Sequence, residues 1–259
     1  MEETRVKVPE SEQDRAAMPR KGDVLSRITH DDSSRKTFLR MVGGAGAVGA
    51  FGTLLAACGE EEEEPTGGGG EPEEPGGGAS QQVLDVFNYA LTLEFLEAKF
   101  YQDVIDSGVI EDETLASIAQ TFGEHEQEHV DTLKAAIEQM GGTPVEDPMG
   151  NFQSVIDGGP MTVLVTAATV ENVGAGAYLA EAPKLIESDE ALAAALSIHT
   201  VEARHAAALN EAAGFGFTGN KMYTGSIPDG PFAEPIDRDA VMKAVQPFLA
   251  GGGSGGGSQ

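Results

Sequence analysis

Two short patterns of glutamate and histidine stand out in the sequence because their spacing suits metal binding. Glu126 is followed three residues later by His129, and Glu202 is followed three residues later by His205. Residues three apart in a helix lie on one face, about one turn from each other. Carboxylate and imidazole groups are both common metal ligands. Each pair could therefore ligate a metal and share a bridging carboxylate.

The spacing belongs to a longer internal repeat. Its members are Glu94, Tyr101, Glu126 and His129 in the first half, and Glu171, Tyr178, Glu202 and His205 in the second. Successive members lie 7, 25 and 3 positions apart in the first half and 7, 24 and 3 in the second. A dinuclear metal site built from two duplicated halves would require this kind of repetition.

The repeated glutamates and histidines interrupt apolar stripes, so we expect them to point into a helical core. Glu94, for example, lies in line with Leu91 and Ala98. Four ionised carboxylates in one core would be unstable without cations, because an isolated buried charge is strongly unfavourable. Two divalent metal ions would neutralise them. The alternative is a hydrogen-bonded network of Glu and His without metal.

Two further glutamates lie close to the predicted ligands. Glu128 points about 200° around its helix from Glu126 and is predicted to be a surface charge. Glu97 lies only about 60° from Glu94, but its counterpart in the repeat is Gly174, which cannot ligate. We therefore expect Glu97 to be a charge at the rim of the site and keep it as the alternative to Glu94.

Nearby rings are expected to support the ligands rather than bind metal. His125 and His199 lie about one turn before His129 and Glu202, where they would contact ligands or solvent. The two repeated tyrosines are either packed core aromatics or hydrogen-bond donors to the ligands. Because they occupy equivalent positions of the repeat, Tyr101 and Tyr178 are included among the site residues as hydrogen-bond donors to the ligands.

The elements that must position these residues are helices. Apolar positions recur every three or four residues in four long segments, and no strand alternation is evident. The expected helix ends are near Gly108, at Gly141-Gly142, before Ser188 and at Gly214. Short connections within each half then form two antiparallel hairpins.

The remaining connections complete the predicted fold. The segment Gly141 to Pro160 is long enough to cross the height of a bundle. A short amphipathic helix at Asp237 to Phe248, with Val241, Ala244, Val245 and Phe248 on one side, is expected to cap it. The predicted fold class is all-α, a four-helix bundle of two hairpins joined by a long crossover.

Residues 34 to 58 have the basic start, apolar middle and small-residue end of an export signal. Ser34-Arg35-Lys36-Thr37-Phe38-Leu39 resembles a twin-arginine motif, with Lys36 in place of the second arginine, and Leu55-Ala56-Ala57-Cys58 resembles a bacterial lipobox. The resemblance implies export by the twin-arginine machinery, with the general secretory route as the alternative, and lipidation of Cys58. The alternative for Cys58 is a lone structural cysteine.

Composition divides the chain into four parts. Residues 1–57 are predicted to be the export signal, and 58–80 the lipidated Cys58 followed by an acidic Gly/Glu/Pro tether. Residues 81–250 form the helical domain, and 251–259 a flexible Gly/Ser tail. The expected location is the outer face of the bacterial cytoplasmic membrane, where the lipid would anchor the protein.

Charge and cysteine content exclude several classes of protein. With 43 acidic and 16 basic residues the net charge is −27, which would repel the phosphates of nucleic acid. A single cysteine excludes a disulfide framework and a multi-cysteine zinc site within one chain. The absence of a run of 18 or more strongly apolar residues argues against a conventional bundle of membrane-spanning helices.

The segments that hold the repeat resemble the ferritin-like superfamily, specifically exported ferritin-like domain proteins. They are Leu91–Tyr101, Glu126–Val130, Glu171–Gly174 with Ala177-Tyr178, and Val201–His205. One glutamate from each of two helices plus a Glu-x-x-His from each of the other two is the ligand pattern of this superfamily. The resemblance implies two Fe or two Mn ions, with Glu94 and Glu171 each mainly on one metal. It also implies that Glu126 and Glu202 bridge the metals and that His129 and His205 are terminal ligands.

The resemblance does not fix the reaction, but because all six ligand positions are intact we favour an oxidoreductase whose small substrate is oxygen or peroxide. Iron would give ferroxidase or peroxidase activity, and manganese would disproportionate peroxide. The alternative is a non-catalytic protein of the cell envelope that binds metal or protects against stress or desiccation. A closed storage cage is less compatible with a lipid anchor on every subunit, so a monomer or small homo-oligomer is expected.

Overall fold

Helices dominate the part of the chain that the structure, a computed structural model, describes: residues 36–39, 79–216, 219 and 232–249. The long helices are α5 (Gln81–Ser107), α6 (Glu113–Gln139), α8 (Pro160–Glu181) and α9 (Asp189–Ala212). The short ones are α7 (Gln153–Asp157), η3 (Ala182–Leu185), α10 (Arg238–Val245) and η4 (Gln246–Phe248). No strand occurs among the described residues, so the predicted all-α fold class is confirmed.

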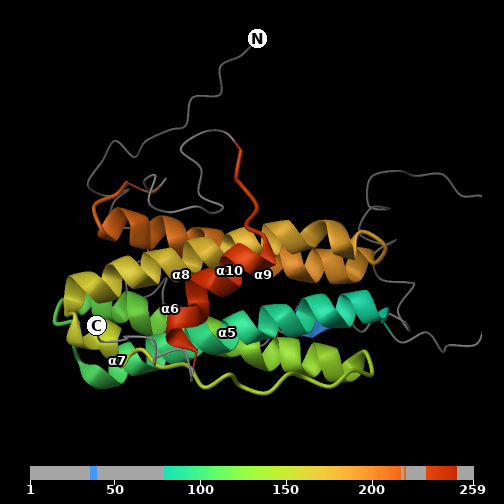
Figure 1. The fold of residues 1–259 in the computed structure, drawn as a ribbon, viewed down its shortest axis with the longest axis horizontal. Helices are drawn as coiled ribbons and strands as arrows, with labels where there is room; N and C mark the ends of the chain where they lie inside the picture. The colour runs from blue at the N-terminus through green and yellow to red at the C-terminus, as the bar shows by residue number, and fades with distance from the viewer. Residues whose placement is uncertain (1–35, 40–78, 217–218, 220–231, 250–259) are drawn as a thin grey trace, which may run out of the picture.

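The long helices form two hairpins (Figure 1). Helices α5 and α6 pack along each other after a short connection, and α8 continues through η3 into α9 in the same way. The two hairpins meet where α5 contacts both α8 and η3. The predicted bundle of two hairpins is therefore confirmed.

Local sequence signals fix where the helices begin and end. The side chains of Ser80, Asp112 and Ser188 accept hydrogen bonds from the free backbone N–H groups at the starts of α5, α6 and α9. Gly108 ends α5 in the left-handed region with φ of 63°, which glycine adopts without steric penalty. The end of α5 agrees with the one expected near Gly108 from the sequence.

The crossover between α6 and α8 runs along the bundle, as the length of the segment predicts (Figure 1). Asn88 on α5 holds its start by donating to the carbonyl of Thr143 and accepting from the N–H of Val145. Phe152, just before α7, is fully buried. The helical turn α7 was not expected from the sequence.

Two apolar clusters fill the bundle on either side of a layer of charged residues. One cluster contains Phe100 and Leu164 with side chains from the crossover and the C-terminal segment. The other contains Phe87 and Leu133 with Leu185 from η3. On α5, Glu94 lies between Leu91 of one cluster and Leu96 of the other. The polar layer therefore lies between the two apolar clusters.

Helix α8 is apolar around most of its circumference because bundle neighbours surround it. By length and composition, Pro160–Leu185 is the one described helix apolar enough to cross a membrane, with a mean hydropathy of 1.3. However, 72% of that apolar window is buried inside the protein. The core helix of a soluble protein meets the same criterion, and a helix that is hydrophobic on all sides is normally a buried one.

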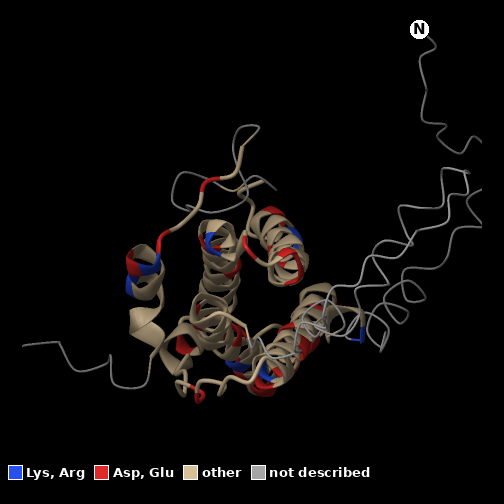
Figure 2. Ribbon diagram, turned by 90° about the vertical axis from the view of Figure 1, so that its right-hand side faces the viewer, with Lys and Arg blue, Asp and Glu red and all other residues tan. Residues whose placement is uncertain are grey.

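The expected short C-terminal helix is present and lies against the outside of the bundle (Figures 1 and 2). The Arg238 guanidinium donates to both carboxylate oxygens of Glu181 on α8, at 2.9 and 2.5 Å. It also lies over the ring of Tyr89 on α5, 4.4 Å from the centroid. These contacts join the C-terminal helix to both hairpins.

The apolar face of α10 differs in one residue from the expected one. Val241 and Val245 are buried, and Phe248 packs against the same cluster. Ala244 is exposed, and Met242 packs against the core instead. The prediction for Ala244 was wrong because the buried side of α10 is centred on Val241 and Val245 and extends toward Met242 rather than toward Ala244.

Most residues of the predicted leader and tether lie outside the described residues. These include Arg35 of the export motif and Cys58 of the lipobox. Lys36 falls in the described helical turn 36–39 and is exposed, whereas Phe38 of the same turn packs against the second apolar cluster.

The close approach of the C-terminal segment to α8 depends on Gly176. The carbonyl of Gly176 accepts a hydrogen bond from the N–H of Ile236 at 3.0 Å. A Cβ atom at position 176 would lie 2.5 Å from Cγ1 and 3.2 Å from Cβ of Ile236, so a rotation of the isoleucine alone would not relieve the overlap.

We expect Gly176→Ala to lower the free energy of unfolding by about 1–3 kcal/mol through overpacking. Thermal or denaturant unfolding would measure the change. In an Ile236→Ala background, which removes Cγ1 but keeps Cβ, the same substitution should lower the free energy of unfolding by a smaller amount, because the most severe overlap is gone and alanine is the better helix former. A stabilising effect of Gly176→Ala in the parent protein would contradict this account of the contact.

Candidate metal centre

The six residues predicted as metal ligands lie together in the polar layer of the bundle. One group of mutually close ligand atoms comprises Glu94, Glu126, His129 and Glu202. A second comprises Glu126, Glu171, Glu202 and His205. The ligand atoms within each group lie within 4.8 Å of one another. Glu126 and Glu202 belong to both groups, so the arrangement offers two adjacent positions that share two carboxylates.

In the first group, the carboxylates converge on Nδ1 of His129. This nitrogen lies 2.8 Å from Oε2 of Glu126, 3.1 Å from Oε2 of Glu94 and 3.3 Å from Oε1 of Glu202. The Glu202 contact is the loosest, and both oxygens of Glu202 lack a hydrogen bond of good geometry. We regard the contact with Glu202 as an electrostatic attraction rather than a hydrogen bond, because the distance is long and the alignment is poor.

The second group has the same form around His205. Its Nδ1 lies 2.9 Å from Oε1 of Glu126 and 3.2 Å from Oε2 of Glu171. Its other ring nitrogen, Nε2, lies 3.0 Å from Nδ1 of His125. Phe122 stacks on the His205 ring with the centroids 3.8 Å apart. His125 and Phe122 therefore fix the orientation of the His205 ring, whose Nδ1 faces the carboxylates.

Each tyrosine of the repeat bonds to a glutamate of the opposite hairpin. The hydroxyl of Tyr178 on α8 donates to Oε1 of Glu94 on α5 at 2.5 Å. The hydroxyl of Tyr101 on α5 donates to Oε1 of Glu171 on α8. The two bonds are related by the pseudo-twofold repeat of the sequence. They leave the second oxygen of each glutamate facing its histidine.

Burial opposes ionisation of the carboxyl groups, but not equally. It raises the pKa of Glu94 to about 7, against the attraction of His129. It also raises the pKa of Glu202 well above the usual range, and the charges of Glu126 and Glu94 add to the effect. For Glu126 the desolvation penalty is outweighed by His129 and His205, which hold its pKa below the ordinary value.

The histidines show the complementary effect. Burial disfavours the imidazolium form of His205, but Glu171 and Glu126 overcome it and raise its pKa to about 10. Glu126 and Glu94 likewise raise the pKa of His129 well above its ordinary value against desolvation. Burial, together with the nearby His205, lowers the pKa of His125 to about 4. A protonated His205 therefore donates from Nε2 to a neutral His125.

The structure corrects the expected position of Glu97. Its side chain is 4% exposed and lies in the core, not at a solvated rim. The sequence did contain a signal for the burial of Glu97. Gly174, within the buried helix α8, leaves space for the larger side chain of Glu97 opposite it. Glu128, in contrast, is exposed, as a surface charge should be.

The two flanking histidines, which the sequence treats alike, have different surroundings. His125 contacts the predicted ligand His205. His199 is half-buried, and its Nδ1 lies 3.0 Å from the carbonyl oxygen of Ala175, so it bonds to the backbone of α8. Only one of the two therefore supports a predicted ligand directly.

The donor set fits two divalent ions of the first transition series. Four carboxylates and two imidazoles face two overlapping positions, and four negative charges would balance two doubly charged cations. Oxygen atoms without hydrogen-bond partners, such as those of Glu202, are what a bound cation would satisfy. The imidazole Nδ1 atoms occupy the centre of each group and would themselves become ligands after losing their protons.

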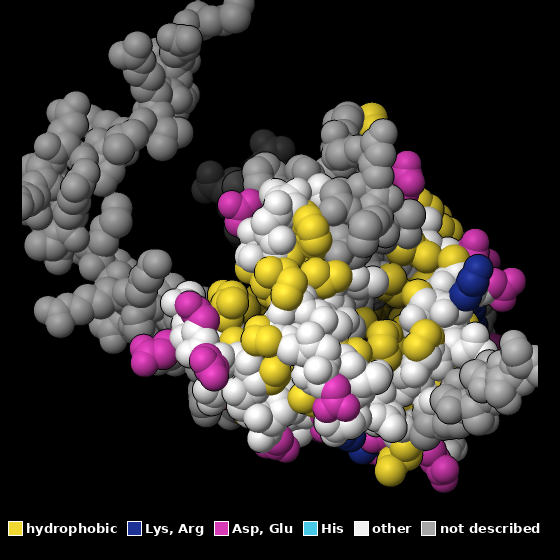
Figure 3. All heavy atoms as spheres, turned by 60° about the vertical axis from the view of Figure 1, so that its left-hand side comes forward, with side chains coloured by type: hydrophobic (Ala, Val, Ile, Leu, Met, Phe, Trp, Pro, Cys, Tyr) yellow, Lys and Arg dark blue, Asp and Glu magenta, His cyan; other side chains and the backbone are white. Residues whose placement is uncertain are grey.

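The outer surface is acidic, in keeping with the composition of the chain. Asp and Glu side chains are spread over the face seen in Figure 3, with few Lys or Arg among them. Figure 2 shows acidic residues on several helices of the bundle. A surface of this kind raises the local concentration of cations.

A protein-family model matches most of the helical domain. The family model described as "Ferritin-like domain" matches residues 82–214, from the start of α5 to just beyond α9. No curated protein matches the chain. The matched segment is just over half of the chain and contains every residue of both ligand groups.

The raised pKa values predict that the metal-free protein loses stability as pH rises. Glu94, with a pKa of about 7, and His205, with a pKa of about 10, bind protons more tightly in the folded state than in the unfolded one. Their contribution is complete below their unfolded pKa values and is lost between about pH 4.5 and 7 for Glu94 and about pH 6.5 and 10 for His205. Glu126 acts in the opposite sense and destabilises the fold only on acidification.

Thermal unfolding of the metal-free protein at pH 5, 7 and 9 would test this expectation, with Tm falling at each step. Metal affinity should change in the opposite direction, because binding displaces the same protons and so tightens as pH rises. A Tm of the metal-free protein that is constant or rises from pH 5 to 9 would contradict the assignment of these charges.

Proposed function

The chain belongs to the ferritin-like domain family, and we propose that it is a dinuclear iron or manganese protein of the cell envelope that reacts with oxygen or peroxide. The observation that carries the proposal is the pair of overlapping ligand groups that share Glu126 and Glu202. A mononuclear site would need only one of the groups. Two groups with common carboxylates suit two ions held side by side.

The residues divide into ligands and groups that orient them. Glu94 and His129 would hold one ion, Glu171 and His205 the other, and the two shared glutamates both. A bound pair of iron or manganese ions would supply redox chemistry with oxygen or peroxide, with coordination positions left open for the oxidant. The Tyr178 hydroxyl fixes Glu94 through one carboxylate oxygen and leaves the other oxygen free to ligate.

The surroundings of the centre would restrict water and protons. Apolar clusters lie on both sides of the polar layer, and Phe122 covers the His205 ring. The side chain of His129 is the more open of the two ligand histidines, with 12% of its surface exposed against 3% for His205. The side of the centre at His129 is therefore the more accessible to a small oxidant.

We expect the purified protein to bind two metal ions per chain. Glu126→Ala or Glu202→Ala should each disturb both ions, because each carboxylate belongs to both groups. Metal analysis after dialysis would count the bound ions, with Glu124→Ala, an exposed residue on the same helix, as the control. A shared-glutamate variant that loses a single ion and keeps the other with unchanged affinity would refute the bridging role.

Activity assays of the metal-loaded protein and its variants would distinguish an enzyme from a non-catalytic metal-binding protein. Protein loaded with ferrous iron should consume oxygen or peroxide faster than free iron, or protein loaded with manganese should release oxygen from peroxide. His129→Ala should abolish the reaction while the helical content is retained. Tyr101→Phe and Tyr178→Phe should reduce it or the metal affinity by about 10–100-fold. If the fully loaded protein reacts no faster than free metal, the non-catalytic role is the correct one.

We also propose that a lipid on Cys58 anchors the protein to the membrane. The support is the order of motifs in the sequence, an apolar segment followed by Leu55-Ala56-Ala57-Cys58 and then an acidic tether. The tether composition cannot form a core, so we expect the acidic segment to separate the helical domain from the anchor.

In the native cell, the parent protein should fractionate with membranes, and Cys58→Ser should give an unprocessed or soluble form of unchanged helical content. Replacement of Arg35-Lys36 by Lys-Lys should block export by the twin-arginine route, and unchanged export would indicate the general secretory route. A parent protein that is wholly soluble and uncleaved would rule out the anchor.

A further inference from the structure

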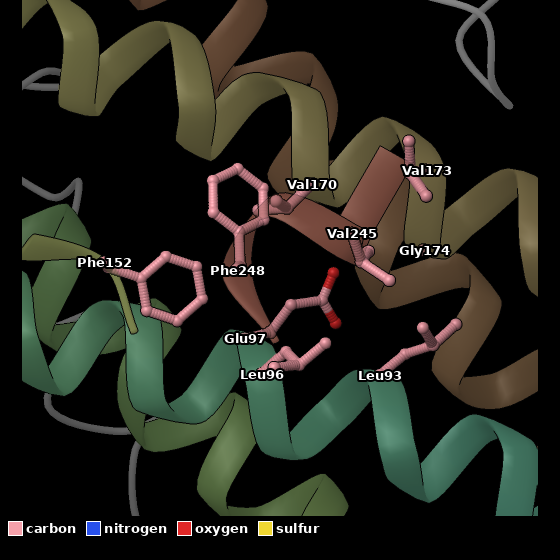
Figure 4. Close-up of a pocket in the computed structure, with 9 residues that line it drawn as sticks. All are labelled: Leu93, Leu96, Glu97, Phe152, Val170, Val173, Gly174, Val245 and Phe248. Atoms are coloured by element: carbon pink, nitrogen blue, oxygen red, sulfur yellow. The ribbon is translucent and has the colours of Figure 1, made fainter. Parts of the chain in front are cut away.

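Glu97 is a buried acid that the six-ligand site does not use. It lies on α5 one turn after Glu94, and its side chain extends from that helix toward α8 (Figure 4). Its Oε2 atom is fully buried and has no hydrogen-bond partner among the described residues. Burying a carboxyl group without a partner is unfavourable, so the position calls for an explanation.

The opposite helix leaves a space for this carboxyl group. A Cβ atom at Gly174 on α8 would lie 2.9 Å from Oε1 of Glu97 and 3.0 Å from Oε2 of Glu202. Glycine is unfavourable within a helix, and any larger residue here would collide with one of the two acids. The glycine therefore allows the Glu97 carboxyl group to approach the shared ligand Glu202.

Positions 97 and 174 are equivalent in the repeat, each three residues after a predicted ligand. The crossed tyrosine bonds place Glu94 level with Tyr178, and Tyr101 level with Glu171, so α5 and α8 run antiparallel. Positions 97 and 174 then face each other between the two levels. The repeat is thus broken where its halves meet, by a glutamate on one side and a glycine on the other.

Among the described residues, the side of Glu97 away from the metal ligands offers no cation to balance it. A cavity of about 10 Å³ lies there, near the lower limit for one water molecule, and its walls include Leu93, Val173, Val245 and Phe248 (Figure 4). The charged groups that act most strongly on Glu97 are Glu202, Glu94, Glu171 and Glu126. Apolar walls on one side and carboxylates on the other leave the two metal positions as the natural source of positive charge.

We propose that Glu97 is a fifth carboxylate ligand of the metal pair. Its carboxyl group would reach the metal ions through the space left by Gly174. The inference rests on the proposed dinuclear function and deepens it. With five carboxylates the ligand set carries one more negative charge than two divalent ions can balance. The two metal positions would also be inequivalent, although the six other ligands are related by the repeat.

Cobalt(II) titration of the metal-free full-length protein, followed by visible absorption, would test the role of Glu97. The parent and the control Asp106→Asn, an exposed acid on the same helix, should bind two ions per chain and give the same spectrum. Glu97→Gln keeps the shape of the side chain but removes its charge. It should change the cobalt absorption bands and weaken binding of at least one ion by about tenfold or more.

Gly174→Ala provides a second variant that leaves the acid in place. Its Cβ would displace the Glu97 carboxyl group, so cobalt binding should weaken as in Glu97→Gln, although alanine favours the helix. The double variant should lose no more than the more affected single variant. Circular dichroism would verify folding, and if Glu97→Gln does not fold, Gly174→Ala alone decides the matter.

Two results would overturn the inference in distinguishable ways. If the parent binds two cobalt ions and the folded variants match it in affinity and spectrum, Glu97 is not a ligand and the dinuclear centre stands with six. If the parent itself fails to bind two ions, the proposed dinuclear function fails, and the role of Glu97 fails with it.

Discussion

The concentration of negative charge in the core is the constraint on which the rest of the structure depends. Four glutamates of the repeat are completely buried, and a fifth, Glu97, is nearly so. Without metal, His129 and His205 supply the nearby positive charge, and their nitrogens lie among the carboxylate oxygens. Two imidazolium groups cannot balance five carboxylates, so several of the acids take up protons, as the raised pKa values of Glu94 and Glu202 indicate. The folded core therefore needs positive charge, which bound cations would supply and which protons supply when no cation is bound.

The bundle meets this constraint by making rigid elements hold each charged group. Tyrosines from the opposite hairpin fix Glu94 and Glu171, and His125 fixes His205. The C-terminal segment adds a wall on the α8 side, held by the Arg238–Glu181 ion pair and by the fit of Ile236 over Gly176. Apolar clusters on either side limit the access of water to the layer. In such surroundings electrostatic attraction is stronger than in water, so small displacements of these groups have large effects.

The bundle and the six predicted metal ligands could both be predicted from the sequence, because both depend on periodic patterns. Helical periodicity fixes which side of α5 carries Glu94, and the duplicated spacing identifies its equivalent on α8. The position of Glu97 could not be obtained in this way. Its environment depends on how closely α5 and α8 pack at this level. The repeat predicts equivalent surroundings for positions 97 and 174, but a glutamate at one and a glycine at the other make them different. The turn α7 and the exposure of Ala244 were missed for a related reason, since irregular segments follow tertiary contacts rather than a period.

The sharing of carboxylates between hairpins has a consequence for how the protein assembles. Each ligand group takes three residues from one hairpin and one from the other, through Glu202 in the first group and Glu126 in the second. An ion in either group would thus act as a reversible crosslink between the halves of the molecule. Neither hairpin alone contains a complete group, so a complete centre forms only after the hairpins have docked. A bound ion would then favour the docked arrangement over separated hairpins, and so tie the stability of the interface to the supply of metal.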